Sequence, residues 1–383
     1  MENETPVTPN AGNTQRSGHK KPSARSVRAA VVRYVLRTVM VLLTTILLVF
    51  GALVLILNAI FNGPSPAARD VITMSMLESS GMKWVPAIFI GEDMVEQIQA
   101  GVNAELPGDI SGNVEISIDL SGGMGGSSDE WANYADGIRI ETITGDNYTA
   151  YVMIVRDPSQ LYVATSTDKF SLSTPGERIT NQIEKEGAIA CVNGGAFYDD
   201  GTGGDRVGSV PCGLVIAEGK VVWDDGTSYN GFVGFNEDNI LIVAKTMTAK
   251  RAKELNIRDG CCFGPVLLMD GVVNDQAYNE NSGFNPRTAI GQRADGAIVL
   301  VCVDGRQPGS LGATYADLID IMVEYEAVNA CNLDGGSSSV MLYRDMEGRY
   351  GDAGEVVMIN SYSALQANPR RMPTYIMVRP KEG

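Results

Sequence analysis

The sequence predicts an α+β fold with mixed β-sheets and few helices, preceded by a single N-terminal transmembrane helix. Two observations lead to this expectation. From residue 141 onward, about a dozen short runs rich in β-branched and aromatic residues alternate with turns built from Gly, Asn, Asp and Pro. Residues 38–61, by contrast, form one long uncharged stretch. The chain has 383 residues and 44% hydrophobic content, enough for a sizeable core.

The N-terminal residues are typical of a tail followed by a membrane anchor. Residues 1–37 are rich in Ser, Thr, Pro and Asn and carry seven basic side chains, which predicts a disordered cytoplasmic tail. Within 38–61, the nineteen residues from Val39 to Leu57 would span about 28 Å as a helix, enough to cross the lipid bilayer core. A cleaved signal peptide would have a shorter apolar core and a small-residue cleavage site, so we expect an uncleaved signal anchor.

The charge distribution predicts an orientation and excludes one class of partner. The tail holds seven of the 30 basic residues and two of the 46 acidic ones. The rest of the chain therefore carries 23 basic against 44 acidic side chains, a net charge of −21. Basic segments stay in the cytoplasm, so the part after about residue 62 is expected outside the cell, held at the cell membrane. A surface this acidic argues against nucleic acid as a partner.

Residues 62–140 are expected to separate the anchor from the main domain. Pro64 and Pro66 indicate a linker, and residues 71–81 and 92–100 fit two amphipathic helices of a stalk. The run from 103 to 136 is rich in Gly, Ser and Asp, which predicts a flexible region.

Residues 141–383 are expected to form the outer domain, mostly from strands. The predicted helices are 174–186, 248–255 and 314–325. The predicted strands are 148–155, 160–165, 188–192, 213–216, 220–223, 232–235, 240–244, 266–269, 288–292, 297–303, 326–331, 340–343 and 374–378.

Histidine is missing from this outer domain, because the only one is His19 in the tail. That excludes a Ser-His-Asp triad, a Cys-His dyad and a histidine metal site there. Carboxylates, Asn, Arg and main-chain N–H groups remain, and a bound metal would be a hard cation such as calcium. The six cysteines have no zinc-site spacing; they fit either buried apolar side chains or disulfides of undetermined pairing.

Polar turns follow several of the predicted strands. Three of them end in Asn193-Gly194-Gly195, Asp304-Gly305-Arg306 and Asp334-Gly335-Gly336-Ser337. Glycine lets a ligand approach the main chain closely, and successive N–H groups can then face one anion. Because each turn sets a carboxylate, Asn or Arg beside glycine, we expect these loops to converge at one edge of a sheet.

Five motifs in order resemble the phosphodiester glycosidase family over about residues 185–380. They are Asn-Gly-Gly-x-Phe at 193–197, Gly-Pro-x-Leu at 264–267, Asn-Pro-Arg-Thr-Ala-Ile-Gly at 285–291, Val-Asp-Gly-Arg at 303–306 and Asn-Leu-Asp-Gly-Gly-Ser-Ser at 332–338. The resemblance implies a glycosidase that hydrolyses a sugar-1-phosphodiester at the bond between sugar and phosphate.

The same resemblance suggests roles for individual residues. Glycoside cleavage usually needs two carboxylates, and Asp334 and Asp304 are the candidates. The guanidinium groups of Arg287 and Arg306 are suited to a phosphodiester anion. The candidates for binding the sugar or the phosphate through side chain or main chain are Asn193, Gly194, Gly335, Gly336 and Ser337.

Each of these roles has a structural alternative. Arg287 fits a structural ion pair, Asp304 a turn cap, and Asn193 an Asx turn that it holds itself. Asp199, Asp200 and Asp205 fit either a calcium site or a solvated loop, and the chemistry requires no cofactor.

Two functions therefore remain open. One is a membrane-anchored extracellular hydrolase acting on surface or extracellular glycans such as an exopolysaccharide. The other is a catalytically silent glycan-binding or cell-wall-organising protein on the same fold. The presence of both Arg and both Asp candidates favours the enzyme.

Overall fold

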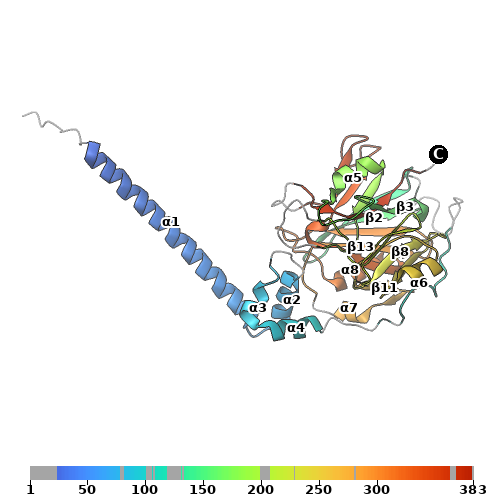
Figure 1. The fold of residues 1–383 in the computed structure, drawn as a ribbon, viewed down its shortest axis with the longest axis horizontal. Helices are drawn as coiled ribbons and strands as arrows, with labels where there is room; N and C mark the ends of the chain where they lie inside the picture. The colour runs from blue at the N-terminus through green and yellow to red at the C-terminus, as the bar shows by residue number, and fades with distance from the viewer. Residues whose placement is uncertain are drawn as a thin grey trace, which may run out of the picture. The chain divides into compact units, whose positions relative to one another are not determined.

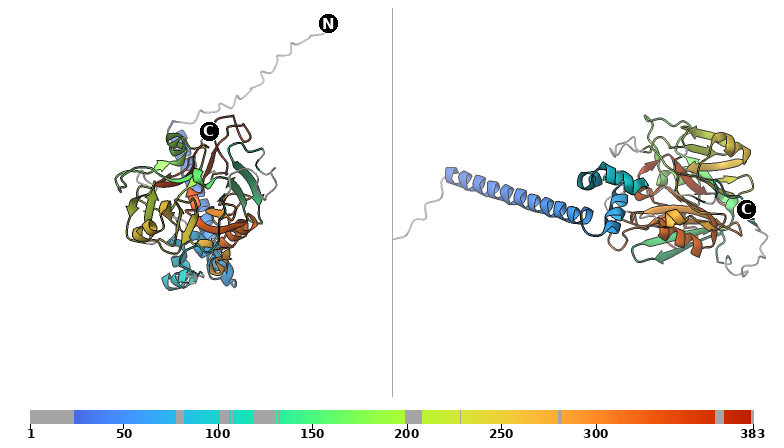
Figure 2. Two further views of the ribbon diagram at one scale, coloured as in Figure 1. Left: turned by 90° about the vertical axis from the view of Figure 1, so that its right-hand side faces the viewer. Right: turned by 90° about the horizontal axis from the view of Figure 1, so that it is seen from below.

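The computed structural model describes residues 24–77, 82–100, 106, 108–118, 131, 133–198, 208–227, 229–279, 282–362 and 368–381. The chain divides into two units, residues 1–59 and 60–383, and each is described by itself. Figures 1 and 2 show a body of β-sheets with short helices in the second unit. The α+β class expected from the sequence is confirmed.

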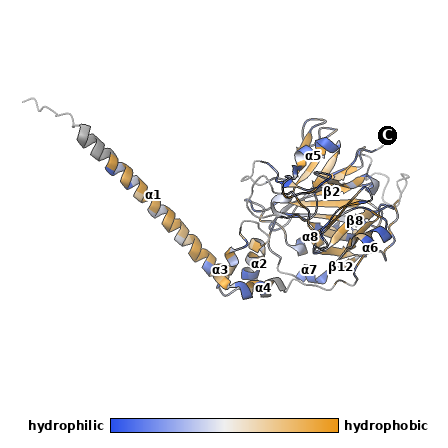
Figure 3. Ribbon diagram, in the orientation of Figure 1, coloured by the Kyte–Doolittle hydropathy of each residue, from blue (hydrophilic) through white to orange (hydrophobic). Residues whose placement is uncertain are grey.

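Helix α1 (Ala24–Phe61) makes up most of the described part of the first unit. Its section Val32–Phe61 has 30 residues and contains an 18-residue stretch with a mean hydropathy of 3.0. Among the described residues, it is the one helix long and apolar enough to cross a membrane. Figure 3 shows hydrophobic residues along almost the whole helix. The helix ends at Phe61, where the anchor was expected to end, but it begins well before residue 38.

Three helices open the second unit, namely α2 (Pro66–Leu77), α3 (Val85–Ile90) and α4 (Glu92–Ala100). The rings of Phe61 and Phe89 stack with centroids 5.2 Å apart, which fixes α3 against the chain at the end of α1. The bounds of α4 are those expected. Helix α2 starts earlier than expected because Pro66 suits a first helical turn, and the sequence prediction missed α3.

Three large sheets and one two-stranded sheet make up most of the described remainder of the second unit, and every pairing among the described strands is antiparallel. The large sheet has the spatial order β1 (Ile138–Thr144), β2 (Thr149–Val155), β14 (Ile298–Val303), β13 (Arg287–Arg293), β15 (Ala327–Leu333), β11 (Val266–Met269) and β12 (Val272–Val273). The β10 sheet has the order β7 (Lys220–Asp224), β6 (Leu214–Ala217), β10 (Ile257–Cys262), β8 (Phe232–Asn236) and β9 (Leu241–Ala244). The β5 sheet has the order β17 (Val356–Met358), β16 (Met341–Arg344), β5 (Ala190–Asn193), β19 (Thr374–Val378) and β3 (Leu161–Thr165).

Each sheet turns one face toward a shared central core. Met153 and Leu300 of the large sheet, Val233 of the β10 sheet, and Val192 and Ile376 of the β5 sheet all belong to it. The alternation of side chains along a strand puts the other residues on the outer faces. In β14, for example, Ile298, Leu300 and Cys302 point to this core while the valines between them point away.

The outer face of each sheet is covered by a helix. Helices α8 (Tyr315–Glu324) and α7 (Asp275–Asn279) pack on the large sheet. Helix α6 (Ala249–Glu254) packs on the β10 sheet, and α5 (Ile179–Glu186) packs on the β5 sheet. Strands buried on both faces explain why the sequence shows short apolar runs with few polar interruptions. Five of the six cysteines are buried in these layers.

The segment of residues 108–118 is held along the edge of the β10 sheet, although we expected it to be part of a flexible region. The N–H of Ser111 donates to the carbonyl of Val243 at 2.9 Å, and the N–H of Val243 donates to the Ser111 hydroxyl at 3.0 Å. The N–H of Lys245 donates to the carbonyl of Asp109. These bonds satisfy edge groups of β9 that would otherwise be open to another strand.

Two other elements differ from expectation. The predicted helix 174–186 begins as β4 (Glu177–Arg178), which pairs with β18 (Arg371–Met372), and only then becomes α5. Strand β10 escaped prediction because Arg258, Asp259 and Gly260 interrupt its apolar pattern. The structure buries Asp259 against the guanidinium group of Arg258, which makes a charged residue tolerable inside the sheet. A short 3-10 turn, Pro158–Gln160, links β2 to β3.

Helix α8 offers a test of this layered packing. Leu318 is fully buried against the large sheet, so Leu318→Ala should lower the free energy of unfolding by about 2–5 kcal/mol through the cavity it leaves. Val323 on the same helix is 49% exposed, and Val323→Ala should cost much less. Denaturant unfolding of the two variants would measure the difference, and equal losses would contradict the assignment of the buried face.

Candidate active site

Three of the polar turns meet at one edge of the large sheet. Strand β13 lies between β14 and β15 and runs antiparallel to both, with Arg287 opposite Val303 and Thr288 opposite Leu333. The start of β13 and the ends of β14 and β15 therefore share an edge. This pairing brings Asn285-Pro286, Asp304-Gly305-Arg306 and Asp334-Gly335-Gly336 together.

The fourth turn reaches the same edge from the β5 sheet, through Asn193. Its Nδ2 donates to the carbonyl of Asp334 at 2.6 Å, and its Oδ1 accepts from the Thr288 hydroxyl at 2.7 Å and from the N–H of Val340 at 3.3 Å. The side chain is fully buried. Asn193 thus joins two sheets and the intervening turn, and the structure does not place it on the cavity described below.

Glycine is required where these turns touch. Gly336 has φ +61°, and its N–H donates to the carbonyl of Pro286 at 2.8 Å. A Cβ on Gly335 would lie 2.8 Å from the same carbonyl oxygen, and one on Gly194 would lie 2.6 Å from Oγ1 of Thr374. The N–H of Gly335 donates to the Asp334 carboxylate at 2.9 Å. Both main-chain donors expected to hold an anion are therefore engaged within the protein, that of Gly335 in its own turn and that of Gly336 by the loop before β13.

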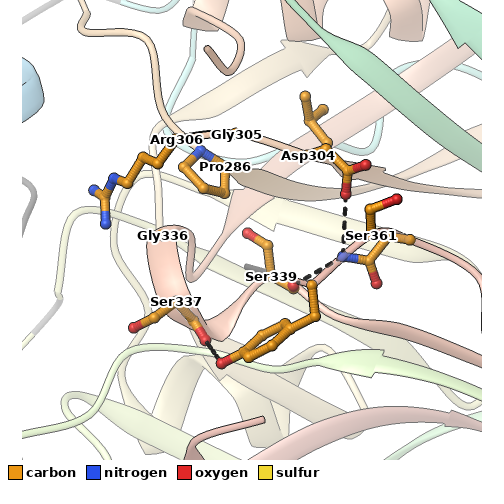
Figure 4. Close-up of a pocket in the computed structure, with 11 residues that line it drawn as sticks. Pro286, Asp304, Gly305, Arg306, Gly336, Ser337, Ser339 and Ser361 are labelled. Carbon is orange, nitrogen blue, oxygen red and sulfur yellow. Dashed lines mark hydrogen bonds between the residues drawn. The ribbon is translucent and has the colours of Figure 1, made fainter. Parts of the chain in front are cut away.

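A cavity of about 200 Å³ opens at this edge (Figure 4). Arg306 and Asp304 extend from the end of β14 to different sides of it, and Ser337 and Ser339 form part of the opposite wall. The hydroxyl of Ser339 is buried and has no hydrogen-bond partner among the described residues. The lining residues are Pro286, Val303, Asp304, Gly305, Arg306, Gly336, Ser337, Ser339, Asn360, Ser361 and Tyr362.

Asp304 is the carboxyl group of this cavity, and only 3% of the residue is exposed. Burial raises its pKa above the ordinary value, and hydrogen bonds from Tyr151, Asn360 and Ser361 oppose that rise without cancelling it. The Tyr151 hydroxyl donates to Oδ2 at 3.2 Å, and Nδ2 of Asn360 donates to Oδ1 at 3.4 Å. A carboxyl group that keeps its proton to higher pH while held by donors is suited to acid–base chemistry.

Asp334, the other predicted catalytic carboxylate, does not line this cavity. It is half-buried, and its carboxylate turns back to the N–H of Gly335. Burial, with smaller contributions from Asp225 and Asp334, raises the pKa of the Cys212 thiol to about 11.

Two arginines flank the Gly336-Ser337 dipeptide. A Cβ on Gly336 would lie 3.5 Å from Nη1 of Arg306, whose other Nη donates to Oδ1 of Asn285 at 2.7 Å. From another segment, Nη1 of Arg370 donates to the Ser337 hydroxyl at 3.3 Å, and its guanidinium lies 4.7 Å from the centre of the Phe197 ring. Sequence reasoning missed Arg370, although Asn368-Pro369-Arg370 repeats the Asn-Pro-Arg pattern of 285–287.

Arg287 occupies a different environment. It is 3% exposed, stacks 4.2 Å from the centre of the Tyr315 ring, and does not line the cavity. Its Nε donates to the carbonyl of Ala313 at 3.1 Å, and Nη2 donates to that of Gly283 at 2.9 Å. These contacts bind the loops before β13 and α8 together, so the geometry supports a structural role for Arg287 in place of the expected phosphate contact.

The proposed metal residues Asp199, Asp200 and Asp205 lie outside the described residues. Within the described part of the chain, no group of three or more His, Cys, Asp or Glu side chains is arranged to hold a metal ion.

Comparison with known proteins agrees with these observations. Residues 186–379, just over half of the chain, match the family described as Phosphodiester glycosidase. The SPbeta prophage-derived uncharacterized protein YomE of Bacillus subtilis (strain 168) is 27% identical over 202 residues. That match covers 51% of this chain and 28% of YomE, so the chain spans under a third of that relative's length.

Among solved structures, one similar fold is the catalytic domain of zebrafish N-acetylglucosamine-1-phosphodiester alpha-N-acetylglucosaminidase, auto-inhibited by its pro-peptide. The TM-score is 0.50 at 19% identity, over 64% of this chain and 82% of that one. A protein from Burkholderia pseudomallei K96243 gives a TM-score of 0.41 at 16% identity, over 61% and 74%. The extent of the family match shows that this chain belongs to the phosphodiester glycosidase family.

Proposed function

We propose that this protein is a membrane-anchored extracellular hydrolase that cleaves the bond between sugar and phosphate in a sugar-1-phosphodiester of surface or extracellular glycans. One observation carries the proposal. A chain of the phosphodiester glycosidase family has a cavity in which a buried carboxyl of raised pKa, Asp304, lies with Arg306 and three serines.

Phosphate recognition is assigned to the arginines beside the 3-10 turn Gly336–Ser338. Arg306 and Arg370 approach the Gly336-Ser337 dipeptide from different segments of the chain. Guanidinium groups form paired hydrogen bonds with phosphate oxygens, so this arrangement suits a singly charged phosphodiester. The Ser339 hydroxyl, buried and without a partner among the described residues, adds a neutral donor.

Bond cleavage is assigned to Asp304 as the general acid. In its protonated form it donates a proton to the bridging oxygen as the bond from that oxygen to the anomeric carbon breaks, which leaves a phosphomonoester. A water oxygen then bonds to the anomeric carbon and gives up one proton to a base. Asp334, which does not line the cavity, remains the candidate for the second carboxylate, either as that base or as a nucleophile.

The location follows from α1 and from the charges around it. The apolar helix follows seven basic residues in the first 37, so we place the N-terminus in the cytoplasm and the second unit outside the cell. The alternative, a silent glycan-binding protein on the same fold, would use the arginines without needing the proton of Asp304.

The acid role predicts a defect in turnover for Asp304→Asn. The variant keeps the shape but has no proton to donate, so turnover of a sugar-1-phosphodiester should fall by about two orders of magnitude or more. In the parent, the rate should fall as pH rises through the raised pKa of Asp304. The pH–rate profile of the variant should lack this decrease. Asp334→Asn serves as the matched comparison. A folded Asp304→Asn protein with near-parental turnover would move the acid role elsewhere, and no turnover in the parent on any substrate would favour the silent binder.

The raised pKa of Asp304 also predicts how stability depends on pH. The folded protein keeps this proton at pH values where the unfolded chain, with an ordinary pKa near 4, has lost it. The resulting stabilisation is complete at low pH and is lost as pH rises through the folded pKa. In denaturant titrations the parent should therefore lose stability relative to Asp304→Asn as pH increases from about 4 to 8. A difference that is constant with pH would contradict the shift.

Arg370 and Arg287 are expected to affect different properties, the first product binding and the second stability. Arg370→Ala should weaken binding of a phosphomonoester product by about 1.5–3 kcal/mol, the range for a charge-assisted hydrogen bond, with a nearly normal melting temperature. Arg287→Ala should lower the melting temperature, because it removes the side-chain donor to the Gly283 carbonyl and one of the two donors to the Ala313 carbonyl in the buried loops. Calorimetric titration and thermal unfolding would separate the two effects. Unchanged product binding in Arg370→Ala would remove Arg370 from the site.

The location predicts exposure of the second unit on intact cells. Added protease should digest an epitope at the C-terminus, while an epitope at the N-terminus should be protected until the cells are lysed. A protected C-terminus would overturn the orientation.

A further inference from the structure

We propose that α3 and the residues just before it form a membrane-contact surface, in which Met82, Trp84 and Ile88 enter the headgroup layer of the bilayer beside the outer end of α1. This inference rests on the membrane anchoring proposed above. It assigns a second contact with lipid, outside the membrane-spanning stretch and independent of the catalytic cavity.

The exposure of these side chains is the first argument. Trp84 is 64% exposed, Ile88 is 65% exposed and Met82 is 42% exposed. The same short segment buries Pro86 and packs Phe89 on Phe61, so its other side already faces protein. Lys83 lies exposed between Met82 and Trp84. An exposed Trp with neighbouring aliphatic side chains and a lysine is the composition of the membrane–water interface, where amphipathic rings and long cationic side chains gather.

The second argument is how close α3 lies to the end of the membrane-spanning stretch. Arg37 is the last charged residue before the apolar stretch. At 1.5 Å per residue, about 20 residues cross the hydrocarbon core of about 30 Å, which places its outer boundary near Asn58. Phe61 then lies about 5 Å beyond that boundary, within the headgroup layer. Because Phe89 stacks on Phe61 with ring centroids 5.2 Å apart, α3 lies next to the residue at which the apolar stretch ends.

A cavity next to this contact has a composition that fits the same layer. It has a volume of about 360 Å³ and combines apolar rings with the guanidinium of Arg69, which pairs with Asp70 at 2.8 Å. A lipid has a charged phosphate next to its apolar acyl chains. An arginine beside apolar walls can contact both parts. The walls come from Phe61, Asn62, Gly63, Arg69, Phe89, Ile90 and Met94.

The sequence allows a direct test, because the chain has 3 tryptophans, Trp84, Trp131 and Trp223. In the full chain, Trp131→Phe with Trp223→Phe leaves Trp84 as the only indole. After reconstitution into phosphatidylcholine nanodiscs, bromine atoms on the upper acyl chain should quench Trp84 fluorescence by about half and shift its emission to the blue. The matched control, Trp84→Phe with Trp131→Phe, leaves Trp223 in the β10 sheet, and its emission should not respond to brominated lipid.

A further variant tests the surface itself. Adding Ile88→Asp to the Trp84-only chain should reduce the quenching at least twofold, since a carboxylate is unfavourable in this layer. The inference would be overturned if Trp84 is unquenched in a chain that alkaline washing does not remove from the membrane. It would also be overturned if the blue shift depends on protein concentration in detergent, which would indicate a second copy of this chain as the occupant. Removal of the chain by alkaline washing would overturn this inference and the anchoring together.

Discussion

The amide of Asn193 is the interaction on which the site depends. A single buried side chain donates to the carbonyl of Asp334 and accepts from Thr288 and Val340. It therefore fixes the positions of the β5 sheet, the large sheet and the turn after β15 relative to one another. Each bond contributes only about 0.5–1.5 kcal/mol net, but an unmet partner in this environment would cost more. The close approaches that exclude any side chain at Gly194 and Gly335 follow from that junction. The geometry of the cavity therefore depends on Asn193, a buried residue that does not itself line the cavity.

The chemistry of the cavity comes from a competition between burial and hydrogen bonding. Tyr151 and Asn360 come from strand β2 and from the segment after β17, and both donate to Asp304. Their bonds stabilise the charged form of the carboxyl group, yet burial among the strand ends is the larger effect and favours the neutral form. The three-sheet core explains how such burial arises, because strands from two sheets meet where β14 ends and close off solvent from one side.

The sequence was informative wherever a local pattern determined the structure. Apolar runs between turn residues located most strands, and the Thr314-to-Asp317 capping box marks the start of α8 that the sequence placed at 314. The sequence was uninformative where the contacts of a residue depend on partners that are distant in the chain. Arg287 and Arg370 follow identical Asn-Pro dipeptides, but only strand register and the neighbouring loops direct one guanidinium to buried carbonyls and the other to Ser337. Nor could the sequence show that the Gly335 N–H is used by Asp334 and the Gly336 N–H by Pro286 of another loop, or that Asp259 has a buried partner inside β10.

The segment of residues 108–118 has a consequence for where the folded domain begins. The family match starts at residue 186, but this earlier stretch lies against β9 and also reaches Asp270, which accepts from the N–H of Gly112 and from the amide of Asn113. Through Asp109, Ile110 and Ser111 it covers the outer side of β9, the edge strand of the β10 sheet. A fragment cut at the family boundary would expose that edge and would also lose β1, β2 and β3, so it would tend to self-associate through unpaired backbone groups. A fragment that keeps this edge of the β10 sheet covered has to start before residue 108.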